Sequence, residues 1–182
     1  MKKLKSVLIG VQVLLLAFTL ISCGDDEQTP EEVVDAFTGC CSSDTAFGEN
    51  VDNLDQSLGE IIVDNIFTPN NDGVNDRFEI KNIELYANHT VTIYNNTDEI
   101  IFESNNYGSD STELFPNVPY DFNGVEGIPD GTYKYKIIIE NEQTFIESGF
   151  FCLFTNNPPI EQNFAECNPI QPGEFDQILT GL

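Results

Sequence analysis

Short apolar segments separated by close polar turns constrain the fold of this chain more than any other feature. They recur between residues 60 and 154, and several alternate apolar and polar side chains. The clearest is residues 132–140, where two tyrosines and two isoleucines fall on one face and two lysines on the other. Heptad patterning of the helical kind is absent. About seven short strands joined by tight turns predict an all-β, antiparallel β-sandwich.

The turns between these segments have residues with a defined conformational role. Residues 95–98 are expected to form a hairpin turn, and residues 140–143 a second hairpin. In residues 128–132, Pro129 fixes φ and Gly131 supplies an open conformation. The predicted strands cover residues 60–66, 77–83, 90–94, 99–103, 132–140 and 144–154.

Residues 66–78 contain the loop with the most distinctive chemistry. An apolar strand breaks at Pro69, passes through an Asn/Asp cluster, and uses Gly73 where φ is expected to be positive. Counted from Thr68, the spacing is similar to that of a calcium-binding loop. The candidate calcium ligands are Asn70, Asp72, Asp76 and Glu79.

A turn capped by its own side chains is the alternative interpretation of this loop, and it is favoured. The first ligand position is Thr68 instead of Asp, Pro69 follows it, and strands flank the loop. Alternation at residues 78–80 also sends Glu79 to the face opposite its neighbours. Calcium is the one ion considered for this loop, and no cofactor is predicted to be required.

Four stretches of the chain resemble a known family: IFTPNNDGVNDRFEI, NIELYANHTVTIYN, IIFESNNYG and PDGTYKYKI. They are similar to the gliding-motility-associated C-terminal domain, also called the type B sorting domain of type IX secretion. The resemblance covers residues 61–154 and implies an immunoglobulin-like sandwich. Two turns depart from the family pattern: residues 96–98 replace Arg-Trp-Gly, and residues 122–124 replace Trp-Asp-Gly. The family domain normally ends its protein, whereas here the chain continues to Leu182.

The first residues are typical of an export leader. Three lysines precede an apolar run at residues 7–21, too short for a comfortable membrane span. Residues 20–24 resemble a bacterial lipobox, which predicts lipidation of Cys23; an ordinary leader followed by a free thiol is the alternative. The acidic run at residues 24–28 resembles export signals to the outer face of the outer membrane, although it is also typical of a solvated tether.

These signals divide the chain into four expected parts. Residues 1–22 are a lipoprotein signal peptide, and residues 23–59 are a lipidated acidic tether with a short helix at residues 29–37. Residues 60–155 form the sandwich. Residues 156–182 are a Pro-rich extension, and both extensions are expected to be short and irregular.

The charge of the chain excludes several classes of partner. Its net charge is −24, and removal of the leader with its three lysines makes it −27. Such a field repels phosphate backbones and anionic headgroups. Nucleic acid is therefore excluded as a partner, as is membrane binding through a basic patch.

The cysteines beyond Cys23 are expected to form disulfides: Cys40, Cys41, Cys152 and Cys167. An exported domain permits such bonds, and the adjacent pair would be strained if it bonded to itself. Cross-links from this pair to the two distant cysteines are preferred, with the pairing open. A metal site of four thiolates is the alternative, but a C-x-x-C spacing is missing.

The sequence offers little for catalysis. The single histidine, His89, is interpreted as a surface residue of a turn, and no nucleophile or second histidine accompanies it. The chain is therefore interpreted as a non-enzymatic lipoprotein of the cell surface. It is expected to be an accessory subunit of an outer-membrane assembly, held at the membrane by its lipid and bound to a barrel protein or another envelope protein.

The binding surface is not determined by the sequence. One candidate is the proline-rich segment, residues 156–172. The other is a group of four aromatic residues: Tyr107, Phe115, Tyr120 and Phe122. For both candidates, ordinary loop packing is an equal alternative. A carbohydrate-binding or adhesive module is the second function considered, although the lack of Trp weakens it. Cargo of type IX secretion or gliding is the third.

Overall fold

The computed structural model describes residues 35–121, 123–155, 167 and 176–180, all within the unit Val34–Leu182. The expected signal peptide, Cys23, most of the predicted helix at 29–37 and nearly all of the C-terminal extension lie outside the described residues. Where the chain is described, no helix is long and apolar enough to cross a membrane. The only α-helix described is α1, Gln177–Thr180.

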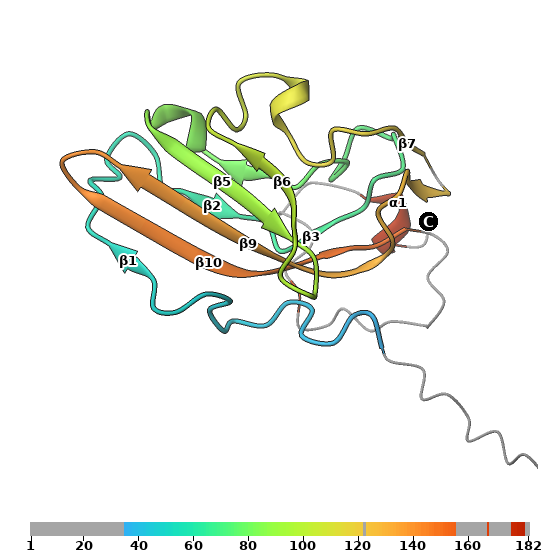
Figure 1. Ribbon diagram of the computed structural model, residues 1–182. Helices are drawn as coiled ribbons and strands as arrows, with labels where there is room; N and C mark the ends of the chain where they lie inside the picture. The colour runs from blue at the N-terminus through green and yellow to red at the C-terminus, as the bar shows by residue number, and fades with distance from the viewer. Residues whose placement is uncertain (1–34, 122, 156–166, 168–175, 181–182) are drawn as a thin grey trace, which may run out of the picture. The chain divides into compact units, whose positions relative to one another are not determined.

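The described chain is built from strands, so the all-β prediction is confirmed (Figure 1). The strands are β1 Val51–Asp52, β2 Ile62–Val63, β3 Ile66–Phe67, β4 Ile80–Lys81, β5 His89–Tyr94, β6 Ile100–Ser104, β7 Tyr120–Asp121, β8 Gly124–Val125, β9 Gly131–Glu140 and β10 Thr144–Leu153. Two 3-10 turns, Ile83–Leu85 and Ser111–Glu113, follow β4 and β6.

One sheet dominates the molecule, with the strand order β1-β10-β9-β5-β6 and β3 beside β10. Its centre is the hairpin of β9 and β10, which pair from Glu140↔Thr144 to Gly131↔Leu153. The predicted alternation of β9 is confirmed, because its buried face carries Tyr133, Tyr135, Ile137 and Ile139, whereas Lys134 and Lys136 are partly exposed. The pairs are antiparallel except the two-residue contact of β3 with β10, which is parallel.

The opposite layer of the sandwich consists of short strands and loops. The pairs β2-β4 and β7-β8 each contribute two residues per strand. Between the layers lies an aromatic core centred on Phe151, whose ring stacks on Phe78 at 3.9 Å between centroids. This buried interior is the principal source of stability, because apolar area removed from water is the largest favourable contribution to folding.

The predicted strand at residues 60–66 divides into β2 and β3, because its two ends pair with different partners. Val63 pairs with Ile80 of β4 in the smaller layer, whereas Ile66 pairs with Cys152 of β10 in the main sheet. The chain therefore crosses between layers at residues 64–65. Periodicity alone does not encode such a change of partner.

The prediction that His89 is a surface turn residue is wrong. It begins β5 and is only 5% exposed, because the alternation of the strand places it on the same face as Val91 and Ile93. Its Nδ1 lies 2.6 Å from the Tyr86 carbonyl oxygen, so Nδ1 carries the proton and donates. His89 is a structural residue of the core.

Two of the four proposed surface aromatics are also buried. Tyr107 and Phe115 are each 1% exposed and belong to the core between the layers. The Tyr107 hydroxyl donates to the Phe78 carbonyl oxygen at 2.5 Å, which satisfies its polar end. Tyr120 is partly buried, and Phe122 lies outside the described residues.

Candidate functional site

The loop between β3 and β4 is held in shape by its own polar side chains. Asp76 accepts backbone N–H groups at both oxygens: Oδ1 from Asn70 at 3.0 Å and Asn71 at 2.6 Å, and Oδ2 from Gly73 at 2.8 Å. Asp72 Oδ1 accepts from the Val74 N–H at 2.8 Å. Because these acceptors satisfy backbone donors within the loop, it has the hydrogen bonding of a side-chain-capped turn.

Three of the four candidate calcium ligands come together in this turn. The Asn70 side-chain amide donates to Asp72 Oδ2 at 2.9 Å, and the Asn70 backbone N–H donates to Asp76 Oδ1 at 3.0 Å. Glu79 is exposed and follows the fully buried Phe78, as the alternation predicted. An ion would have to share carboxylate oxygens that already accept N–H groups, so calcium binding stays the less favoured interpretation.

A buried carboxylate from the C-terminal region contacts the same loop, and sequence reasoning missed it. Asp176 is fully buried, and its Oδ2 accepts hydrogen bonds from the Thr68 hydroxyl and, at 3.0 Å, from the Asn75 amide. These partners are separated from Asp176 by 108 and 101 residues. The only local signal is an Asp immediately before a short apolar turn, which is typical of a helix N-cap.

Arg77 connects the end of this loop to the segment that leads into β7. Its guanidinium donates to the Pro116 carbonyl oxygen and lies 4.9 Å from the centroid of the Tyr120 ring. A cation over an aromatic face is attracted by the ring quadrupole. Arg77 therefore positions the segment before β7 and explains why Tyr120 is only partly available on the surface.

The four cysteines beyond Cys23 meet in one cluster. The structure pairs Cys40 with Cys152 and Cys41 with Cys167, so that each member of the adjacent pair bonds to a distant cysteine. All four sulfur atoms lie within 4.8 Å of one another. In a reduced chain the same four sulfur atoms are close enough together to bind one soft metal ion. The geometry is therefore compatible with the alternative of a metal site formed by four thiolates.

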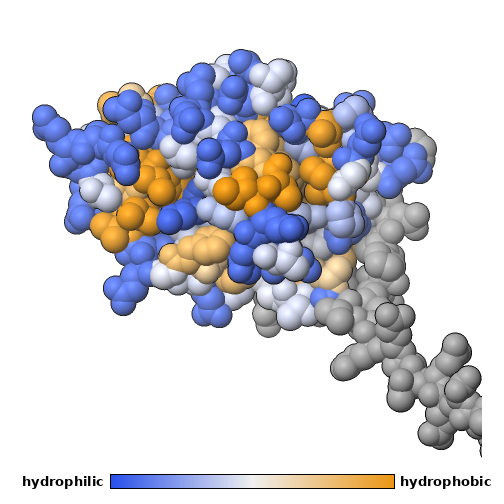
Figure 2. Space-filling model, in the orientation of Figure 1, coloured by the Kyte–Doolittle hydropathy of each residue, from blue (hydrophilic) through white to orange (hydrophobic). Residues whose placement is uncertain are grey.

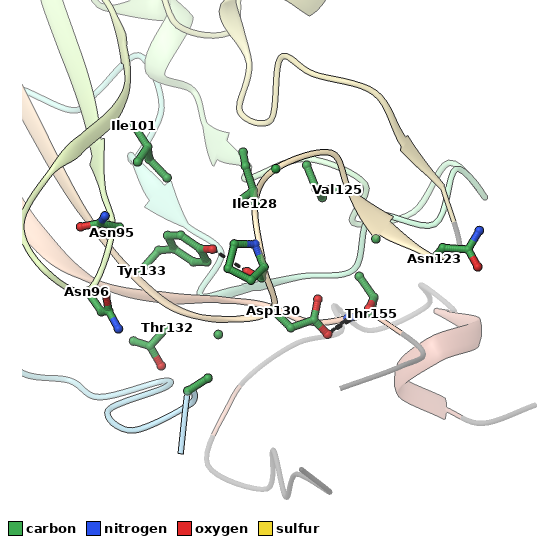
Figure 3. Close-up of a pocket in the computed structure, with 15 residues that line it drawn as sticks. Asn95, Asn96, Ile101, Asn123, Val125, Ile128, Asp130, Thr132, Tyr133 and Thr155 are labelled. Atoms are coloured by element: carbon green, nitrogen blue, oxygen red, sulfur yellow. Dashed lines mark hydrogen bonds between the residues drawn. The ribbon is translucent and has the colours of Figure 1, made fainter. Parts of the chain in front are cut away.

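A hollow of about 740 Å³ lies beside the edge strand β6 (Figure 3). Ile101, Ile128 and Tyr133 form its apolar part, and Asp130 with Thr155 forms a polar corner. Asp130 Oδ2 accepts from both the backbone N–H and the hydroxyl of Thr155 at 2.9 Å. Burial raises the pKa of Asp130, and the two bonds from Thr155 oppose that rise.

Exposed apolar side chains continue from this hollow along β6. Ile100 is 58% exposed and Ile101 37% exposed, and among the described strands β6 pairs only with β5. Figure 2 shows apolar patches separated by hydrophilic side chains on this face of the molecule. An unpaired edge with apolar side chains can accept an additional strand from a partner.

Comparison with known proteins gives one family. The family model described as CHU_C type IX secretion signal domain matches residues 61–153. No curated protein and no solved structure matches the chain. The matched segment runs from the residue before β2 to the end of β10, so it contains the loop between β3 and β4, the edge strand β6 and most of the hollow.

Proposed function

Because the chain belongs to the CHU_C type IX secretion signal domain family, we propose that its sandwich is a non-catalytic recognition module. Membership in this family implies a protein associated with the cell envelope or surface. A fold carries function only through its sites, so the proposal depends on a surface that another protein can bind. The observation that carries it is the family match itself, which covers this sandwich and its open edge.

We place the binding surface at β6 and the adjoining hollow. A partner strand could pair with the free edge while its side chains contact Ile100 and Ile101 and enter the hollow. Glu99 and Glu103 flank these residues in a chain of strongly negative charge, which favours a partner segment with basic side chains. The partner is then a protein of the envelope, with a barrel protein of the outer membrane as the first candidate.

The lipid anchor expected at Cys23 would hold this module at the membrane. The acidic run after Cys23 supports the outer face of the outer membrane, and the cysteine cluster requires an oxidising compartment if its disulfides are to persist. An accessory subunit of an outer-membrane assembly combines these features. Its sandwich binds the partner while its acyl chains keep it nearby.

Purification under mild detergent tests this function. The native chain should bring down an envelope protein in near-stoichiometric amount, and Ile101→Lys should reduce the recovered partner at least tenfold. Leu58→Lys is the matched control, because Leu58 is 69% exposed outside the edge strand. Recovery of no partner by the native chain, or equal loss with both variants, contradicts the proposed surface. Binding to glycans in place of a protein favours an adhesive module.

A second function, cargo of type IX secretion, is favoured by the family description. If the sandwich is a secretion signal, a reporter fused to residues 34–182 and exported by an unrelated signal peptide should reach the medium only in cells with working type IX secretion. Retention of the reporter in such cells supports the accessory role instead. We favour the accessory role because the chain carries its own candidate anchor and a C-terminal region bonded to Cys41 through Cys167.

A further inference from the structure

We propose that Thr68 and Asn75 form a binding site for a carboxylate that caps a short helical turn. The ligand in this chain is its own C-terminal segment, residues 176–180. The site is defined by contacts within the chain, so it stands independently of any envelope partner. Nothing in the family description assigns a ligand to this loop.

The receptor half of the site is assembled by the backbone of the loop. The Thr68 N–H donates to the Asn75 carbonyl oxygen at 2.7 Å, which brings the two side chains together across the loop. Thr68 is fully buried, and Asn75 adopts a positive φ of 51°, a conformation that asparagine tolerates better than most residues. A hydroxyl and an amide are therefore held side by side as two neutral donors.

Both donors bind the same oxygen of the ligand. The Thr68 hydroxyl and the Asn75 amide donate to Asp176 Oδ2, the latter at 3.0 Å. The turn itself is capped by other side chains of the loop, chiefly Asp72 and Asp76. The Thr68 hydroxyl and the Asn75 amide, by contrast, bind Asp176.

The other oxygen organises the ligand. Asp176 Oδ1 accepts the N–H groups of Ile178 at 2.8 Å and Leu179 at 3.0 Å, which is the geometry of a helix N-cap. A fully buried carboxylate is costly unless its oxygens are hydrogen-bonded, and here both are. The site therefore fits an Asp side chain followed by a helical turn, because one oxygen binds the loop while the other caps the turn.

The segment is tethered close to its receptor. Cys167 is bonded to Cys41, and eight residues separate Cys167 from Asp176. A short tether turns binding into an intramolecular event with an effective concentration in the millimolar range. A carboxylate from another molecule must therefore displace the tethered segment, and reduction of the Cys41–Cys167 disulfide should make this displacement easier.

Amide hydrogen exchange in the full-length oxidised chain tests the docked segment. Asp176→Asn and Thr68→Val should each speed exchange at Ile178 and Leu179 at least tenfold. Thr68→Ser keeps the hydroxyl and should retain the protection, as should Thr90→Val, which removes a threonine hydroxyl elsewhere on the surface. Unchanged exchange in Asp176→Asn would overturn the proposal, and this near-isosteric variant does not depend on the folding of the Thr68 variants.

Binding of the C-terminal segment as a separate peptide gives a second test. A purely structural contact would not produce such binding. A fluorescent peptide of residues 174–182 should bind the Asp176→Asn chain at least tenfold more tightly than the wild type, whose site is occupied. Adding Thr68→Val should abolish this binding, and a peptide with Asn in place of Asp should not bind. Equal peptide binding with and without Thr68→Val contradicts the assigned receptor.

Discussion

Glu147 makes the stability of the folded protein depend on pH. It lies half-buried on β10, where its Oε1 accepts a hydrogen bond of 2.7 Å from the Tyr135 hydroxyl. Burial raises the pKa of Glu147 above its usual value, the bond from Tyr135 opposes the rise, and the charge of Asp52 adds to it. The folded state therefore binds more protons than the unfolded state between the two pKa values, and stability falls as pH rises through that window.

Glu147→Gln should accordingly stabilise the protein at neutral pH. The amide oxygen can still accept from Tyr135, while the cost of a partly buried charge disappears. We expect a melting temperature higher by about 2 °C at pH 7, with the gain shrinking toward zero near pH 4. Thermal melts across this range would measure it. Glu142→Gln, in the exposed turn between β9 and β10, controls for the loss of one negative charge; an equal gain in both variants would contradict the assignment to Glu147.

The loop carboxylates make a second prediction at this scale. Asp72 and Asp76 already accept backbone N–H groups, so we expect EDTA to leave the melting temperature of the purified protein unchanged. A calcium site would show itself differently, because a bound ion stabilises the folded state by mass action. A melting temperature that falls in EDTA and is restored by added calcium, but not by magnesium, would establish the ion instead.

At the scale of elements, the β9-β10 hairpin organises the fold. Tyr135 lies opposite Gly149 in the register, and its ring covers the glycine. A Cβ at Gly149 would lie 2.8 Å from the Tyr135 hydroxyl oxygen and 2.9 Å from a ring carbon. The glycine is therefore required by the close approach of the ring, not by its backbone conformation.

Gly149→Ala should destabilise the protein by about 1–3 kcal/mol, because the ring must move within a packed core. Chemical denaturation measures the loss. Tyr135→Phe removes the nearest atom, so the same glycine substitution should cost less in that background. An unchanged stability of Gly149→Ala would show that the ring contact does not require the glycine.

At the scale of the whole molecule, two disulfides close long loops. Cys40–Cys152 joins residues 112 apart and fastens the segment before β1 to the end of β10. Cys41–Cys167 joins residues 126 apart and fastens the C-terminal region. The first bond therefore constrains the sandwich, whereas the second mainly constrains the C-terminal region beyond β10.

Paired substitutions should separate these roles. Cys40→Ser with Cys152→Ser should lower the free energy of unfolding by about 2–4 kcal/mol. Cys41→Ser with Cys167→Ser should lower it by less than about 1 kcal/mol while increasing hydrogen exchange at Ile178 and Leu179. Non-reducing mass spectrometry checks the pairing beforehand. Four free thiols in the native protein, or equal losses from the two pairs of substitutions, would contradict this division.

Features of the fold that depend on residues close together in the sequence could be predicted, whereas features that depend on distant residues could not. Alternation over residues 132–140 identified the buried face of β9, and local turn chemistry located the hairpin at residues 95–98. The burial of Tyr107 depends on contacts with Phe78 and Phe115, which its polar neighbours do not reveal. The split of residues 60–66 depends on which distant strands they pair with.

The candidate site shows the same limit. The residues of the capped turn were recognisable because each bond spans only a few positions. The contact of Asp176 with Thr68 spans 108 positions, and no periodicity or spacing links the two. The family resemblance supplied what local patterns could not, since the matched residues 61–153 enclose the sandwich.

Exposure on intact cells tests most directly the claim that this chain is a recognition module of the cell surface. Protease added to intact cells should degrade the protein while leaving a periplasmic control protein whole, and lysis should then expose the control. Protection of the chain until the outer membrane is broken would contradict the account.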